Sequence, residues 1–181
     1  MKILAFAASS SRKSINKQVV THAANVLQGM NSAADVNIVD LNNFEMPIYS
    51  ADREIADGIP QLAKDFHALI GNADGLLISY AEHNGNYAAA YKNIFDWCSR
   101  LEGKVFQGKP MVVTSVSMGP GGGANVLNLA VTSAPHFDAN VVGSFSVGPF
   151  GQKFDADAQA FTDVELTTAL ETSLTALIAA I

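Results

Sequence analysis

Hydroxyl, cationic and amide side chains are concentrated in one short segment, Ser9-Ser10-Ser11-Arg12-Lys13-Ser14-Ile15-Asn16. An apolar run at residues 3–8 precedes it and a helical pattern follows, so the segment is a turn at the start of a helix. The first N–H groups of a helix lack partners and attract anions, and Ser and Arg side chains donate to phosphate oxygens. These residues predict a phosphate site. On their own they fit a serine-rich helix cap equally well.

Two further polar turns follow apolar runs. The segment Ala81–Tyr87 combines an acid, an imidazole, amides and the turn pair Asn-Gly, which suits the edge of a heteroaromatic ring but also an ordinary surface turn. The segment Ser117–Gly123 is rich in glycine, so its backbone can approach a flat ligand closely; alone, it reads better as a mobile turn. The stretch 119–124 also fits G-x-G-x-x-A, but that fingerprint belongs after the first strand, which disfavours a Rossmann NAD site.

Other chemistry has little support. The four histidines (residues 22, 67, 83 and 136) have no metal-ligand spacing, so we expect no metal site. The chain shows no convincing catalytic triad. Cys98 falls within a helical pattern, which favours a packed residue over a nucleophile.

Alternating strand and helix patterns position these turns. We expect strands at residues 2–8, 35–41, 75–80, 110–117 and 139–147, helices at 16–30, 59–72, 87–101, 124–134 and 161–181, and a long loop at 42–60. This alternation predicts an α/β fold, a three-layer, doubly wound, five-stranded parallel sheet for which the order 2-1-3-4-5 is common. In that order the ligand crevice opens at the carboxyl ends of strands 1, 3 and 4, where the three polar turns lie.

Composition narrows the class of protein. The 181 residues suit one domain spanning 1–181, without a linker or repeat. The net charge of −6 disfavours nucleic acid and anionic membranes as partners, and no apolar run is long enough to insert in a membrane. A single cysteine excludes an intrachain disulfide and suits a reducing compartment, and the first residues lack a signal-peptide core, so we expect the cytoplasm.

Several motifs in order along the chain resemble the NADPH-dependent FMN reductase family, which includes quinone, azo-dye and chromate reductases. The resemblance covers residues 2–147, and the tail helix is compatible with it. The motifs are Ser9-x-Ser11-Arg12-x-Ser14-x-Asn16, Glu82-x-Asn84-Gly85-Asn86-Tyr87, Lys92-Asn93-x-x-Asp96-Trp97, Lys109-Pro110 and the glycine-rich turn that ends at Gly123.

This resemblance implies a flavodoxin-like fold and assigns three groups of cofactor-binding residues. Those for the FMN phosphate are Ser9, Ser11, Arg12, Ser14 and Asn16. Those that border the isoalloxazine are Glu82, His83, Asn84 and Gly85, with His83 where the family often has tyrosine. Those that contact the flavin from strand 4 are Ser115, Ser117, Met118, Gly119 and Gly122.

The resemblance also implies an activity. NADPH or NADH would give a hydride to flavin N5, and a quinone-like or other small acceptor would then be reduced, with no catalytic side chain required. A homodimer or homotetramer is expected, with the helix bearing Trp97 and the loop 42–60 as candidate contacts. The alternatives are a flavodoxin-type FMN electron carrier and a flavin-binding subunit or sensor. A receiver-type signalling domain is disfavoured, because strands 1 and 3 lack the required acids.

Overall fold

A parallel five-stranded sheet forms the centre of the computed structural model, which describes residues 1–181. Its order is β2-β1-β3-β5-β6, so the predicted order 2-1-3-4-5 is confirmed. The numbering differs because the two-residue strand β4 pairs antiparallel with the end of β3. The bounds are β1 (Lys2–Ala8), β2 (Asp35–Val39), β3 (Gly75–His83), β4 (Asn86–Tyr87), β5 (Pro110–Val116) and β6 (Asn140–Val147).

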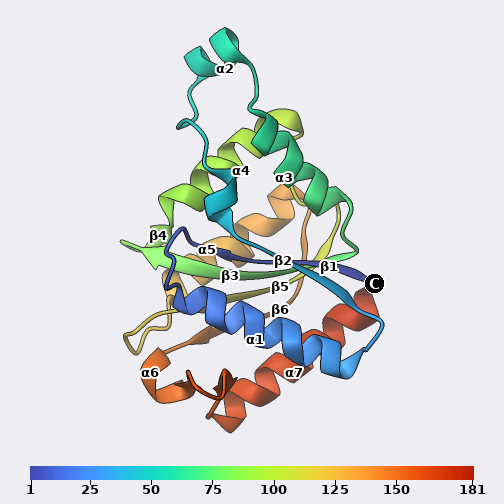
Figure 1. Ribbon diagram of the computed structural model, residues 1–181, viewed down its shortest axis with the longest axis vertical. Helices are drawn as coiled ribbons and strands as arrows, with labels where there is room; N and C mark the ends of the chain where they lie inside the picture. The colour runs from blue at the N-terminus through green and yellow to red at the C-terminus, as the bar shows by residue number, and fades with distance from the viewer.

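Helices cover both faces of the sheet, as expected for strands that are buried on both sides (Figure 1). On one face lie α1 (Ile15–Met30) and α7 (Val164–Ala180); on the other lie α3 (Gln61–Gly71), α4 (Ala89–Leu101) and α5 (Ala124–Ser133). The alternation of side chains along β1 builds both cores. Leu4 and Phe6 join the core under α3, α4 and α5, whereas Ile3 and Ala5 join the core under α1 and α7.

The expected loop at 42–60 is wrong in part. It contains the end of a 3-10 helix, η1 (Leu41–Phe44), and the short helix α2 (Ala51–Asp57), which rises away from the body (Figure 1). None of the α2 residues is buried, so no apolar periodicity marks this helix in the sequence. We call residues 45–58, which include α2, the α2 arm; its base is fixed by α4. Asn93 accepts a bond from the Tyr49 N–H (2.8 Å), and Trp97 Nε1 donates to the Pro47 carbonyl (2.7 Å).

The segment before the last helix is also more structured than the sequence indicates. A second 3-10 helix, η2 (Ala134–Phe137), follows α5, and a short helix, α6 (Phe150–Lys153), and a small hairpin of β7 (Phe154–Asp155) and β8 (Ala160–Phe161) follow β6. The tail helix therefore begins at 164, where Asp163 caps it, and not near 161. No helix has both the length and the apolar character needed to span a membrane.

Candidate functional site

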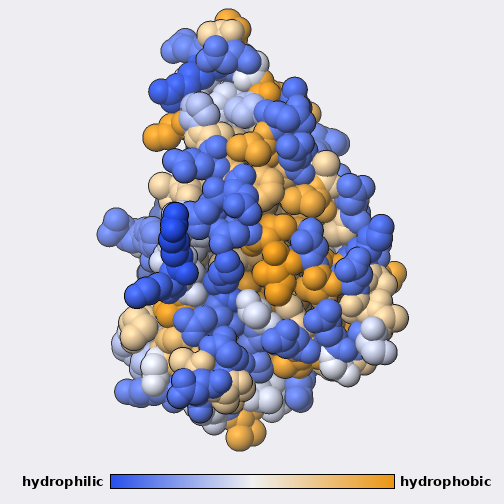
Figure 2. All heavy atoms as spheres, in the orientation of Figure 1, coloured by the Kyte–Doolittle hydropathy of each residue, from blue (hydrophilic) through white to orange (hydrophobic).

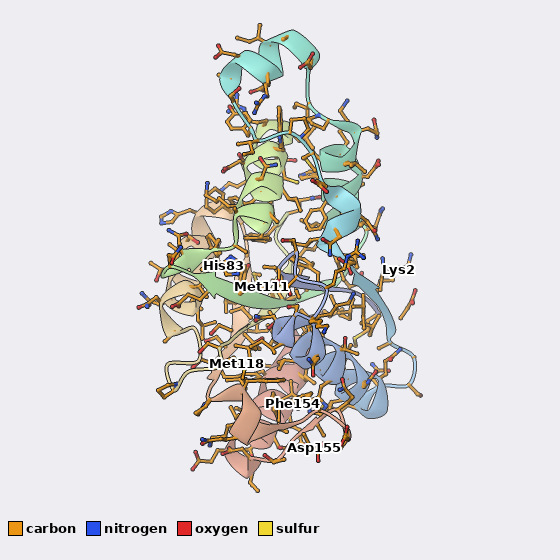
Figure 3. The ribbon with its side chains drawn as sticks, turned by 60° about the vertical axis from the view of Figure 1, so that its left-hand side comes forward. Lys2, His83, Met111, Met118, Phe154 and Asp155 are labelled. Atoms are coloured by element: carbon orange, nitrogen blue, oxygen red, sulfur yellow. The ribbon has the colours of Figure 1, made fainter.

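The three polar turns meet at the carboxyl edge of the sheet. The strand register places Ala8 beside Tyr80, Tyr80 beside Ser115, and Ala81 beside Val116. Figure 3 shows His83 and Met118 at the same end of the molecule, opposite Lys2 at the start of β1. A cavity of about 270 Å³ lies between the turns and is lined by Ser9, Ser11, Lys13, Ser14, Ile15, Asn16, Ala81, Glu82, His83, Val116, Ser117 and Met118.

The serine turn, residues 9–14, is both a helix cap and a cation-bearing loop. The Ser14 hydroxyl accepts from the Lys17 N–H (3.2 Å), which makes Ser14 the N-cap of α1. Arg12 and Lys13 are exposed and form no ion pair. The helix N-terminus and the two cations give this part of the cavity a positive field. The arrangement suits one anion.

The next cation on α1 is already neutralised. Lys17 Nζ lies 2.6 Å from Asp40 Oδ2, at the end of β2. The hydrogen bond from Lys17, and next the main-chain bond from Asn42, lower the pKa of the Asp40 carboxyl to about 2. The charge of Lys17 is therefore used to join α1 to the end of β2, and the free positive charge of the site rests on Arg12 and Lys13.

Asn16 is held in place by a residue that the sequence analysis missed. The Ser79 hydroxyl donates to Asn16 Oδ1 at 2.8 Å, and both residues are buried. The Asn16 amide nitrogen has no protein partner, yet no buried side-chain polar atom is left without one, so this donor reaches solvent at the cavity that Asn16 lines. The only signal for Ser79 was a hydroxyl within an otherwise apolar strand.

The second turn is a hairpin of β3 and β4, residues 82–87. Asn84 and Gly85 have φ of 53° and 76°, which fits the type I′ turn that Asn-Gly favours. His83, Asn84 and Gly85 are exposed at its tip, and of these His83 lines the cavity. The Glu82 carboxylate instead accepts from the Val126 N–H of α5 at 3.0 Å.

The glycine turn, residues 117–123, is packed rather than loose. A Cβ on Gly122 would lie 3.1 Å from the side chain of Ser146, and the Gly122 φ is +59°. The Ser115 hydroxyl, fully buried, donates to the Gly122 carbonyl (2.8 Å), and Ser117 donates to the Gly119 carbonyl (3.1 Å). Ser115 and Gly122 therefore hold the turn in shape without lining the cavity themselves. Met118, 66% exposed, lines the cavity.

The predicted site residues thus fall into two groups. Eight of them line the cavity: Ser9, Ser11, Ser14, Asn16, Glu82, His83, Ser117 and Met118. The other six lie around it, at the tips or the backs of the same three turns: Arg12, Asn84, Gly85, Ser115, Gly119 and Gly122. Lys13, Ile15, Ala81 and Val116 also line it, and the sequence analysis did not assign them to the cofactor.

A doubly wound parallel sheet of order β2-β1-β3-β5-β6, with polar turns at the carboxyl ends of β1, β3 and β5, defines the flavodoxin-like class. Within that class the chain belongs to the NADPH-dependent FMN reductase family, whose sequence model matches residues 1–152. The resemblance inferred from the motifs is confirmed.

Individual relatives agree with this family. A 2-hydroxy-1,4-benzoquinone reductase from a Burkholderia species is 36% identical over 120 residues, which cover 66% of this chain and 62% of the relative. A quinone reductase from Escherichia coli K12 is 32% identical over 108 residues, which cover 54% of this chain and 57% of the relative. The chain therefore spans about three-fifths of the length of these curated relatives.

Solved structures support the fold. A flavoenzyme NAD(P)H:(acceptor) oxidoreductase from Paracoccus denitrificans superposes with a TM-score of 0.74 at 21% identity, covering 98% of this chain and 95% of the other. An azoreductase from Bacillus anthracis superposes with a TM-score of 0.67 at 14% identity, covering 98% of this chain and 100% of the other. The likeness to both extends over nearly the whole chain, including the segment after residue 152.

Proposed function

We propose that residues 1–181 act as one FMN-binding domain that oxidises NADPH or NADH and reduces quinone-like acceptors. One observation carries the proposal: the serine turn, the hairpin and the glycine turn all line one cavity. The cations of the serine turn, Arg12 and Lys13, have no ion-pair partner. The family and the names of the quinone reductases among the relatives support the same reaction class.

The residues present fit FMN. The serine turn and the first turn of α1 offer hydroxyls, two cations and the free amide nitrogen of Asn16 to one phosphate, which is what a mononucleotide requires. No atom of a non-adjacent residue lies within 4 Å of the place of a Cβ at Gly85, Gly119 or Gly121, so the backbone is open there to a flat ring. FMN, when bound, supplies the hydride-transfer chemistry.

The chain's own residues would bind and orient the FMN. Ser9, Ser11, Arg12, Ser14 and Asn16 would hold the phosphate, while His83, Asn84, Gly85, Ser117, Met118 and Gly119 would border the ring. Ser79, Ser115 and Gly122 keep those groups in place from behind. No side chain is needed as an acid or base, because the flavin would supply the chemistry.

The decisive experiment is to purify the protein, add FMN, remove the unbound flavin and record the absorbance spectrum. We expect bound flavin and FMN-dependent oxidation of NADPH or NADH with benzoquinone. A colourless protein with neither property would refute the proposal. Flavin binding without nicotinamide oxidation would instead indicate the electron carrier.

A narrower experiment tests the serine turn. Arg12→Ala should weaken FMN binding by about tenfold, because a charge-assisted bond contributes about 1.5–3 kcal/mol before solvent exposure reduces it. Lys64→Ala, an equal change in net charge on the exposed side of α3, is the matched control and should leave affinity unchanged. Equal FMN affinity of wild type and Arg12→Ala would show that the phosphate does not bind at this turn.

We further propose that the protein is a homodimer or homotetramer. Trp97, on the helix expected to make contacts, is 1% exposed and bonded to Pro47, so it packs within the chain. Two of the most exposed large apolar residues, Ile48 (73%) and Ile55 (84%), lie instead on the α2 arm, where Figure 2 shows apolar side chains on a largely hydrophilic protrusion. Light scattering tests this assembly, and a monomer at micromolar concentration would contradict it.

We also propose that the protein acts in the cytoplasm. The use of NADPH or NADH and the single, unpaired cysteine are consistent with that compartment.

A further inference from the structure

Helix α5 begins behind the glycine turn without a cap of its own. Its N-cap residue is Gly123, at φ +77°, which has no side chain to accept from the first N–H groups. Glu82, from the hairpin, takes that role. One carboxylate oxygen accepts from the Val126 N–H at 3.0 Å and the other from the Asn125 side-chain amide at 3.4 Å. A carboxylate at a helix N-terminus is favoured both by these donors and by the helix dipole.

This contact joins two loops that the sheet itself does not hold together. The register between β3 and β5 ends at Ala81 and Val116, where β5 ends, whereas β3 continues to His83 and pairs only with β4. Beyond that point, side-chain bonds connect the hairpin to α5: Glu82 from one strand, and the Tyr87 hydroxyl, 3.3 Å from that of Ser133, from the other. Glu82 is the link nearer to the cavity, which it also lines.

We propose that Glu82 is a positioning residue, which sets the separation between the hairpin and the glycine turn and thereby the width of the slot for the flavin ring. The inference rests on the proposed FMN site and changes the role expected for Glu82. Its carboxylate is already bonded to α5, so it acts on the ring's position through the glycine turn rather than by touching the ring.

Two substitutions distinguish the effect of the length of the Glu82 side chain from the effect of its charge. Glu82→Gln keeps the length of the side chain and an oxygen that can accept from Val126, but it removes the charge. Glu82→Asp keeps the charge and shortens the side chain by one methylene. If positioning is the role, FMN affinity measured by fluorescence should stay within about threefold for Glu82→Gln and fall by about tenfold for Glu82→Asp and Glu82→Ala.

A matched control removes general destabilisation as an explanation. Asp163 also caps a helix, α7, by accepting from the Leu166 N–H at 3.0 Å; it pairs with Lys153 as well and does not line the cavity. Asp163→Ala should lower the melting temperature but leave FMN affinity within about threefold of wild type. If it weakens FMN binding as much as Glu82→Asp does, or if Glu82→Asp and Glu82→Ala bind FMN like wild type, the inference is overturned. The same holds if Glu82→Gln loses affinity while Glu82→Asp retains it.

Hydrogen exchange of the protein without FMN gives an independent measure of the link. The Val126 amide should exchange at least about tenfold faster in Glu82→Asp than in wild type, and close to the wild-type rate in Glu82→Gln and Asp163→Ala. Unchanged exchange in Glu82→Asp would show that Glu82 does not hold α5. A wild-type protein that takes no FMN would refute the proposed function, whereas this exchange measurement would still decide whether Glu82 joins the two loops.

Discussion

Ser79→Ala should damage both stability and cofactor binding, although Ser79 does not line the cavity. Its hydroxyl is the donor to Asn16 Oδ1, at 2.8 Å, and the exposed fractions of the two residues are 0% and 3%. Removing the hydroxyl leaves a buried amide oxygen without a partner. The desolvation cost of such a group is about 1–3 kcal/mol. For a protein of this length, that loss corresponds to a decrease in melting temperature of about 2–12 °C.

The effect on FMN is a consequence of the same bond. Without Ser79 the Asn16 side chain is free to rotate, so its amide nitrogen no longer faces the cavity in one orientation. Loss of one well-oriented hydrogen bond, about 0.5–1.5 kcal/mol, should weaken FMN affinity by about 2–10-fold. Differential scanning calorimetry without FMN and a fluorescence titration with FMN measure the two effects separately.

Ser173→Ala is the control for this experiment. Ser173 is also a buried serine, but its hydroxyl donates to the Ala169 carbonyl within α7 (2.7 Å), which the helix backbone still satisfies. It should change stability by less than about 0.5 kcal/mol, because alanine also has the higher helix propensity. The reasoning fails if Ser79→Ala is as stable as Ser173→Ala and binds FMN like wild type.

Two predictions concern ionisable groups away from the ring. The pKa of Asp40 is lowered to about 2, mainly by Lys17, so its contribution to stability is complete above the unfolded value of about 3.9 and is lost as the pH falls through the folded value. Asp40→Asn should therefore flatten the decrease in stability between about pH 4 and 2, measured by urea unfolding, and an unchanged slope would contradict this. Burial raises the pKa of the Cys98 thiol to about 12, so it should resist iodoacetamide at about pH 8 in the folded protein and react in guanidinium. Rapid alkylation of the folded protein would contradict its packed position.

The convergence of the three turns could be predicted because it depends on order alone. Alternating apolar runs and helical patterns define parallel strands, and a parallel sheet places every strand's carboxyl end at one edge. The local chemistry of the tight turn was also readable, since Asn84-Gly85 carries a strong preference for positive φ.

The direction of individual side chains was not readable in the same way. Whether the Glu82 carboxylate bonds to a ligand or to a helix depends on the three-dimensional position of α5, whose N-cap residue has no side chain. Ser79 depends on a contact with Asn16, 63 positions away. Helix α2 was not predicted because all of its residues lie outside the core, so burial imposes no hydrophobic pattern on them.

The two interpretations of the serine turn, a helix cap and a phosphate site, can be separated at Ser14. Its oxygen accepts from the Lys17 N–H, while its own proton is free to donate to an anion, so one hydroxyl can serve both roles. Asp is as good an N-cap as Ser and gains from the helix dipole, so Ser14→Asp should leave the melting temperature unchanged or higher. Its carboxylate would repel a phosphate bound beside it, and FMN affinity should fall by more than about tenfold. Ser14→Ala should show the opposite ranking in stability, with a loss of about 1 kcal/mol, and a smaller loss of affinity. If Ser14→Asp binds FMN as tightly as wild type, the anion does not lie at this turn, and Ser14 is only a cap.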